Sequence, residues 1–143
     1  LYYCRGHYFS YQGKSPFTQL IYPVPEAHGL GIHASLDIGG QLKFGPDTQY
    51  INDIDYEVSD ALKAKFVTAI QRYYPSLDAE RLQPAYSGIR PKLEGPRDGF
   101  KDFVIQGENV HGLEGLVNLF GIDSPGLTSS LAIADYVSES LSL

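Results

Sequence analysis

Apolar and polar residues alternate along the first third of the chain, and this period of two predicts strands. The clearest stretch is residues 30–38, in which every second side chain up to Ile38 is apolar and His33 belongs to the polar face. Gly39 and Gly40 follow, and because glycine accepts positive φ they predict a two-residue hairpin turn. Further strands are expected over residues 5–10, 20–25 and 41–45, the last with Leu42 and Phe44 on its apolar face.

The middle of the chain changes to a helical period, which predicts a helix over residues 58–74. Ser59 is a suitable N-cap, Asp60 suits the first turn, and Pro75 ends the segment. One apolar stripe follows from the spacing of Leu62, Phe66, Ile70 and Tyr73.

The last third combines short strands with a helix. Apolar runs over residues 103–106 and 116–120, each near a glycine, predict buried strands. A helix is expected over 129–141, with Leu131, Ala134, Val137 and Leu141 on one side. The fold class expected is α+β, mostly an antiparallel sheet with a flanking helix, followed by a strand, a loop and a helix. A composition shift near residues 83–88 places a boundary between parts 1–83 and 84–143.

Composition and charge narrow the function classes. The chain has 143 residues, with 11 basic and 17 acidic side chains and a net charge of −6, which disfavours nucleic acid as a partner. The single cysteine, Cys4, has no intramolecular disulfide partner, and neither it nor any histidine has metal-ligand spacing, so no metal site is expected. The chain has no apolar run of ~20 residues, so no transmembrane helix is predicted. The chain contains no methionine, so either a short leader has been trimmed or the chain is the interior and C-terminal part of a longer protein.

The loop over residues 121–128 is the most informative candidate for chemistry. It joins a strand to a helix through glycine, serine and proline, so backbone N–H groups are expected to point above the helix N-terminus. Such groups suit a phosphate, a carboxylate or a ring carbonyl that gains negative charge. An ordinary tight strand–helix connection explains the same pattern.

Three side chains stand out by their type. Arg90 lies before a proline in a stretch with few charges, and its guanidinium suits a carboxylate, although a surface arginine or a structural ion pair has the same pattern. His33 could act as a general base near neutral pH, or it could be a hydrogen-bonded histidine of the sheet. Tyr8 could face a ligand, although packing is the commoner role.

Seven segments, taken in order, resemble one family. In this order they are similar to the C-terminal part of L-2-hydroxyglutarate dehydrogenases and related oxidases, which are D-amino-acid-oxidase-like FAD flavoproteins. The similarity extends over essentially the whole chain, although the family's glycine-rich dinucleotide motif is absent from it. The segments cover residues 5–9, 20–25, 30–33, 43–47, 88–92, 102–107 and 116–128.

The resemblance implies roles for particular residues. Residues 1–83 would form a substrate-binding sheet, and residues 84–143 the last piece of an FAD-binding domain. Oxidation of an L-2-hydroxy acid by hydride transfer to flavin N5 would use His33 as the base, or His7 as the second candidate, with Arg90, Lys92 and Tyr8 at the substrate. The residues expected to contact FAD are Gly88, Ile89, Gly121, Ile122, Ser124, Pro125, Gly126, Leu127 and Thr128.

Two other functions remain open at this point: an amine or amino-acid oxidase of the same superfamily, and a non-catalytic binding or assembly module. The expected partners are a small 2-hydroxy acid and the missing N-terminal FAD-binding part of the same protein. Without that part we expect weak FAD binding, little activity and self-association through an exposed apolar face. The expected location is cytoplasmic, or mitochondrial if the source is eukaryotic.

Overall fold

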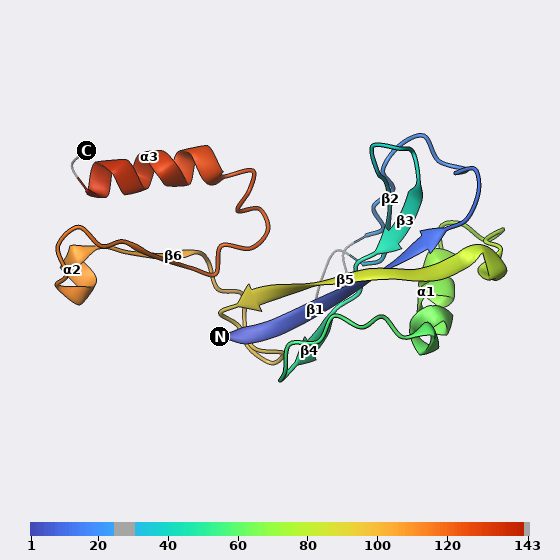
Figure 1. Ribbon diagram of the computed structural model, residues 1–143, viewed down its shortest axis with the longest axis horizontal. Helices are drawn as coiled ribbons and strands as arrows, with labels where there is room; N and C mark the ends of the chain where they lie inside the picture. The colour runs from blue at the N-terminus through green and yellow to red at the C-terminus, as the bar shows by residue number, and fades with distance from the viewer. Residues whose placement is uncertain (25–30, 142–143) are drawn as a thin grey trace. The chain divides into compact units, whose positions relative to one another are not determined.

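The computed structural model describes residues 1–24 and 31–141 and has a mixed α+β fold with a mostly antiparallel sheet (Figure 1). It divides into two compact units. We call Tyr3–Ile89 the sheet unit, and Leu1–Tyr2 together with Arg90–Leu143 the hairpin unit. The division falls between Ile89 and Arg90, within strand β5 (Leu82–Lys92), which also contains the boundary expected after residue 83.

Strand β1 (Tyr2–Tyr11) is the centre of the sheet. Strands β3 (Leu42–Gly45) and β4 (Gln49–Ile51) both pair antiparallel with it, one with each half of β1. Strand β2 (His33–Leu36) pairs antiparallel with β3, and β5 pairs with β1. The expected strand over 20–25 is reduced to one bridge between Ile21 and Ala34. Residue 25, the last of that range, and residue 30, the first of the expected strand over 30–38, lie outside the described residues.

The hairpin of β2 and β3 forms where the two glycines predict it, but its turn is wider than two residues. Beyond the pair of Leu36 with Leu42, the N–H of Asp37 donates to the carbonyl of Gln41 at 3.1 Å, which leaves residues 38–40 as the loop. The N–H of Gly40 donates to the carbonyl of Asp37 at 2.9 Å. Gly40 has φ 79°, the left-handed conformation that closes a three-residue hairpin loop. Because the strand ends before the turn, Ile38 leaves the sheet and is exposed, contrary to the alternation that placed it on the apolar face.

The helical segment is shorter than the stripe predicts. Ser59 is the N-cap of a 3₁₀ turn, Asp60–Leu62, and its hydroxyl accepts from the N–H of Ala61 at 3.2 Å. Helix α1 then runs over Lys63–Ile70 and gives way to turns before the proline. A second 3₁₀ turn, Ala79–Arg81, leads into β5.

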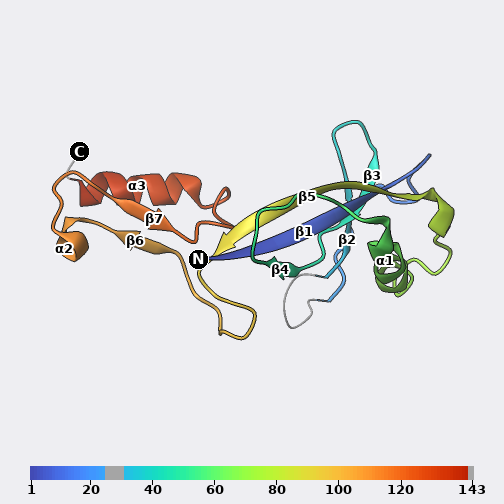
Figure 2. The same ribbon diagram turned by 60° about the horizontal axis from the view of Figure 1, so that its bottom comes forward.

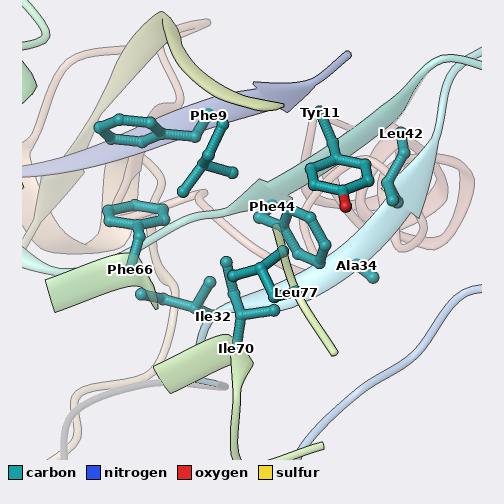
Figure 3. Close-up of a cluster of buried hydrophobic side chains, with 10 residues drawn as sticks. Phe9, Tyr11, Ile32, Ala34, Leu42, Phe44, Phe66, Ile70 and Leu77 are labelled. Carbon is teal, nitrogen blue, oxygen red and sulfur yellow. The ribbon is translucent and has the colours of Figure 1, made fainter. Parts of the chain in front are cut away.

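One face of the sheet and helix α1 enclose the core. Alternate residues of β1 point toward the helix, and the ring of Phe9 lies 4.5 Å from the ring of Phe66, centroid to centroid (Figure 3). The apolar residues of the strands and those of the helix therefore pack together in a single layer. Its buried members are Phe9, Tyr11, Ile32, Ala34, Leu42, Phe44, Phe66, Ile70, Leu77 and Leu82.

The hairpin unit holds the three elements expected there. Strands β6 (Val104–Gln106) and β7 (Asn118–Phe120) pair antiparallel, with the short helix α2 (Glu108–His111) between them in sequence. Helix α3 (Ser130–Ser140) runs alongside these strands (Figure 2). None of the described helices of the chain is long and apolar enough to cross a membrane.

The prediction that β6 and β7 are buried is wrong. Leu119 is 45% exposed and Phe120 44% exposed, while Leu131 on α3 is 81% exposed. Two strands of three residues, the one-turn helix α2 and the helix α3 are too few elements to surround a side chain on every side. The apolar runs thus locate the two strands, but they do not show whether other elements bury them.

Candidate functional site

The sheet unit has a second face, opposite α1, which we call the outer face. Ala34, Phe44 and Phe9 are neighbours across three strands and point into the core. Since successive side chains of a strand alternate in direction, the residues beside them in sequence belong to the outer face. His33 on β2, directly paired with Gly45 on β3, and Tyr8 on β1 therefore form one row on this face.

Gly45 contributes no side chain to the middle of that row, and its backbone is buried. Its φ is 141°, and an added Cβ would lie 2.5 Å from the carbonyl oxygen of His7 and 2.8 Å from Cδ1 of Tyr8. Only glycine fits here, and its position lets the Tyr8 ring lie against the backbone of β3. The row therefore has a buried glycine at its centre, with the imidazole of His33 on one side and the phenol of Tyr8 on the other.

Aromatic side chains and one cation extend the row. Tyr86 of β5 stacks on Tyr8 with ring centroids 4.6 Å apart, and the ammonium of Lys43 lies 5.3 Å from the centroid of Tyr86. The exposed ring of Tyr22 stacks on His33 with centroids 4.7 Å apart. His33 is thus held in place by stacking on Tyr22.

His7 occupies the opposite, helix-covered face and is 1% exposed. Its Nδ1 lies 2.7 Å from Oδ1 of Asp47, and its backbone N–H donates to the same oxygen at 2.8 Å. Lys65 of α1 donates to Oδ2 of Asp47 at 2.6 Å. Burial raises the pKa of the Asp47 carboxyl, but the hydrogen bonds from Lys65 and His7 outweigh burial and hold that pKa below its usual value.

The two candidate histidines are therefore on different faces of the sheet. Nε2 of His7 is buried and has no hydrogen-bond partner among residues 1–24 and 31–141. The pairing of His7 with Asp47 and Lys65 was not anticipated. The sequence does show an acidic residue, Asp47, directly after Gly45-Pro46 in the segment 43–47. It gives no sign that this carboxylate would contact His7 or Lys65 of the helix.

In the hairpin unit, Arg90 and Lys92 differ in their surroundings. Arg90 is exposed, and its guanidinium makes no hydrogen bond or ion pair within the described part of the chain. Lys92 lies 2.6 Å from a carboxylate oxygen of Glu94 and 3.4 Å from one of Asp123. Burial lowers the pKa of the Lys92 ammonium, but the two carboxylates outweigh burial and raise that pKa above its usual value.

The loop over residues 121–128 leads from β7 to α3. Gly121 has φ 69°, and a Cβ there would lie 2.7 Å from Cδ1 of Leu93. The N–H of Gly126, expected to point toward the cofactor, instead donates to the carbonyl of Asp123, closing a turn. The N–H groups of Leu127 and Thr128 have no acceptor among the described residues.

These groups fit the carbonyl end of a flavin ring. Two N–H donors without acceptors stand just before an 11-residue helix, whose N-terminal end carries partial positive charge. The buried Gly126 adds no side chain between the donors and a planar ring. Gly88 and Ile89, also expected at the cofactor, belong to the sheet unit, whereas the loop belongs to the hairpin unit.

Comparison with known proteins identifies the class. The family model described as FAD dependent oxidoreductase matches residues 1–140, and the chain belongs to this family. Among its relatives, the mitochondrial L-2-hydroxyglutarate dehydrogenase of Arabidopsis thaliana is 52% identical over 94% of this chain, which spans 30% of that protein. The resemblance drawn from the ordered segments is confirmed.

Two further proteins match over most of the chain, one in sequence and one in structure. The glycerol 3-phosphate dehydrogenase of Caloramator mitchellensis is 29% identical over 82% of the chain, which spans 23% of that protein. The solved structure of dithionite-reduced L-alpha-glycerophosphate oxidase from Mycoplasma pneumoniae with FAD bound has a TM-score of 0.78. It is 23% identical, and the match covers 99% of this chain and 36% of that one, so it supports the fold.

Proposed function

We propose that this chain supplies the substrate-binding sheet and the flavin-capping loop of an FAD-dependent dehydrogenase or oxidase. Its substrate would be an L-2-hydroxy acid of the 2-hydroxyglutarate type. The observation that carries the proposal is the outer-face row, in which His33 of β2 pairs directly with Gly45 of β3, beside Tyr8. Identity of 52% to an L-2-hydroxyglutarate dehydrogenase supplies the substrate class. The rest of the FAD-binding part would complete the enzyme.

His33 is the proposed general base. A hydroxyl group is a weak acid, so its proton must pass to a base when the C2 hydride leaves, and an imidazole suits this near neutral pH. His7 is the weaker candidate because it is buried under α1 and already bonded to Asp47. Bound FAD supplies the hydride acceptor at N5.

The other proposed roles follow from charge and position. Arg90 binds the substrate carboxylate, since its guanidinium offers paired donors and meets no acceptor within the described part of this chain. Tyr8 forms an aromatic wall of the substrate site. The N–H groups of Leu127 and Thr128 bind the flavin C2 carbonyl, where negative charge develops during reduction.

An amine oxidase of the same superfamily is the second candidate. Oxidation of an amine needs no strong base, so a histidine in the row at Gly45 favours a hydroxy acid. The relatives named for L-2-hydroxyglutarate and for glycerol 3-phosphate also act, by their names, on alcohols. These two observations place the hydroxy acid first.

Anaerobic mixing of the complete, FAD-loaded protein with a panel of 2-hydroxy and 2-amino acids tests this choice. We expect L-2-hydroxyglutarate to bleach the flavin and the amino acids to leave it oxidised. His33→Asn should slow bleaching about 10²–10⁴-fold, the usual contribution of a positioned base, while FAD stays bound. His111→Asn, in the hairpin unit, is the matched control. Bleaching by amino acids alone would overturn the proposal.

A further inference from the structure

We propose that Lys92 is a positioning residue that neutralises Asp123 and thereby lets the loop over residues 121–128 favour reduced FAD. This inference rests on the proposed function, and it gives Lys92 a role other than binding a second substrate carboxylate. Lys92 lies at the end of β5, whereas Asp123 lies inside the loop. Their ion pair therefore joins two segments that are far apart in sequence.

Asp123 is built into the shape of the loop. Its backbone N–H donates to the carbonyl of Gly121 at 2.9 Å, and its own carbonyl accepts from the N–H of Gly126. These two backbone bonds fix the position of residue 123 in the turn that precedes the donors at Leu127 and Thr128, and replacement of its side chain leaves both bonds available. A carboxylate is held about four residues before those donors whether or not the chemistry benefits from it.

An unpaired carboxylate there would oppose flavin reduction. Reduction adds negative charge at the pyrimidine end, the end that the loop donors suit. The Asp123 side chain is 16% exposed, so water screens its charge incompletely. A negative charge held close to the reduced ring raises the free energy of the reduced state and lowers the flavin potential.

Lys92 supplies the balancing charge from a suitable position. Its side chain is 22% exposed, and it contacts Glu94 as well as Asp123. One ammonium shared between two carboxylates leaves a net negative group, and removal of that ammonium would leave two uncompensated charges beside the loop. Lys92 is consequently committed to contacts within its own unit rather than standing free for a ligand.

Lys101 offers a matched control. Its ammonium also lies in the hairpin unit and contacts the backbone, 3.3 Å from the carbonyl oxygen of Leu93. Replacement of Lys101 by glutamine removes the same charge from the protein but leaves the Lys92–Asp123 pair intact. Any effect of net charge alone should therefore appear equally in both variants.

The test is the midpoint potential of FAD in the complete holoenzyme, measured by equilibration with a redox dye and without substrate. We expect Lys92→Gln to shift the potential to more negative values and Asp123→Asn to shift it to more positive values. The double variant should lie close to the wild type, and Lys101→Gln should equal it. Lys92→Arg, which keeps the charge, should restore most of the Lys92→Gln shift.

Several outcomes would overturn the inference. An unchanged potential in Lys92→Gln with full FAD content would do so, as would a shift of equal size in Lys101→Gln. A rise in KM for the diacid substrate at constant potential would assign Lys92 to the substrate instead. If Lys92→Gln does not fold, Asp123→Asn decides alone, and a potential that fails to rise counts against the inference. Failure of the wild type to bind FAD would instead contradict the proposed function.

Discussion

The sheet unit and the hairpin unit contain the same kinds of element but differ in what covers them. In the sheet unit, α1 closes one face, and Phe66 and Ile70 are buried completely. In the hairpin unit, α3 is longer yet has no buried residue. An amphipathic pattern therefore specifies which side chains can be buried, whereas burial itself needs an opposing layer. The two units make this difference measurable within one chain.

Truncation of the core should have the largest effect. Phe66→Ala removes a buried ring that packs on Phe9, and we expect the sheet unit to lose about 3–5 kcal/mol of unfolding free energy. Urea unfolding followed by circular dichroism measures the loss. A change below about 1 kcal/mol would contradict the packing of α1 described above.

Removal of Arg90 should affect activity strongly and stability little, because the side chain is exposed and has no partner within the described residues. In the complete enzyme we expect Arg90→Ala to lower kcat/KM by about 2–4 kcal/mol, the scale of a lost charge-assisted pair. Steady-state kinetics and unfolding curves on the same preparation separate the two effects. Unchanged kcat/KM would exclude Arg90 from the substrate site.

Disruption of the buried Asp47 pair should cost less than the core truncation. Asp47→Asn leaves Lys65 without its anion, but Lys65 is 52% exposed and regains water, so we expect a loss of about 1–3 kcal/mol. Lys63→Gln, on the same helix without an ion pair among the described residues, is the control. Equal losses in both variants would argue against a specific pair.

The contribution of Asp47 and its partners should also appear as a pH dependence of the stability of the unmodified chain. The folded pKa of Asp47 lies below its unfolded value of 3.8, so the carboxylate stabilises the fold above that value. This contribution is lost as pH falls through the folded pKa. Unfolding midpoints measured between about pH 5 and 2 should therefore decline more in the wild type than in Asp47→Asn. Parallel declines would show that other carboxylates dominate.

Substitution on α3 should have the smallest effect. Leu131 is 81% exposed, so Leu131→Ser should change stability by no more than about 0.5 kcal/mol. Leu131 and Phe66 are a fair comparison, because each was predicted on the apolar side of a helix. A loss comparable to that of Phe66→Ala would mean that α3 is covered in solution.

Much of the fold could be predicted because its determinants are local. Ser59 bonds within its own turn, Gly40 has the positive φ that closes a hairpin, and alternation marks Leu42 and Phe44 as a buried pair. The helix ends earlier than its stripe because turns replace it after Ile70. Local rules therefore identify the elements and miss their last turn or two.

The candidate site was predictable only in its residue types. The sequence singles out His33, His7, Arg90 and Lys92, but it does not separate their surroundings. The structure places His33 on the outer face and His7 beneath α1, and it pairs Lys92 with two carboxylates. The roles assigned to these residues at FAD and substrate remain predictions for the experiments above.

The sequence by itself determined the order and type of most elements, the glycine turns and the membership in a flavoprotein family, because these depend on local backbone preferences and on ordered motifs. Only the tertiary structure decided which pattern is buried, on which face of the sheet each histidine lies and which ions pair. Those properties depend on residues distant in sequence, as the contact of Asp47 with His7 and Lys65 shows. Strand register and helix docking bring such residues together, and no local pattern encodes either.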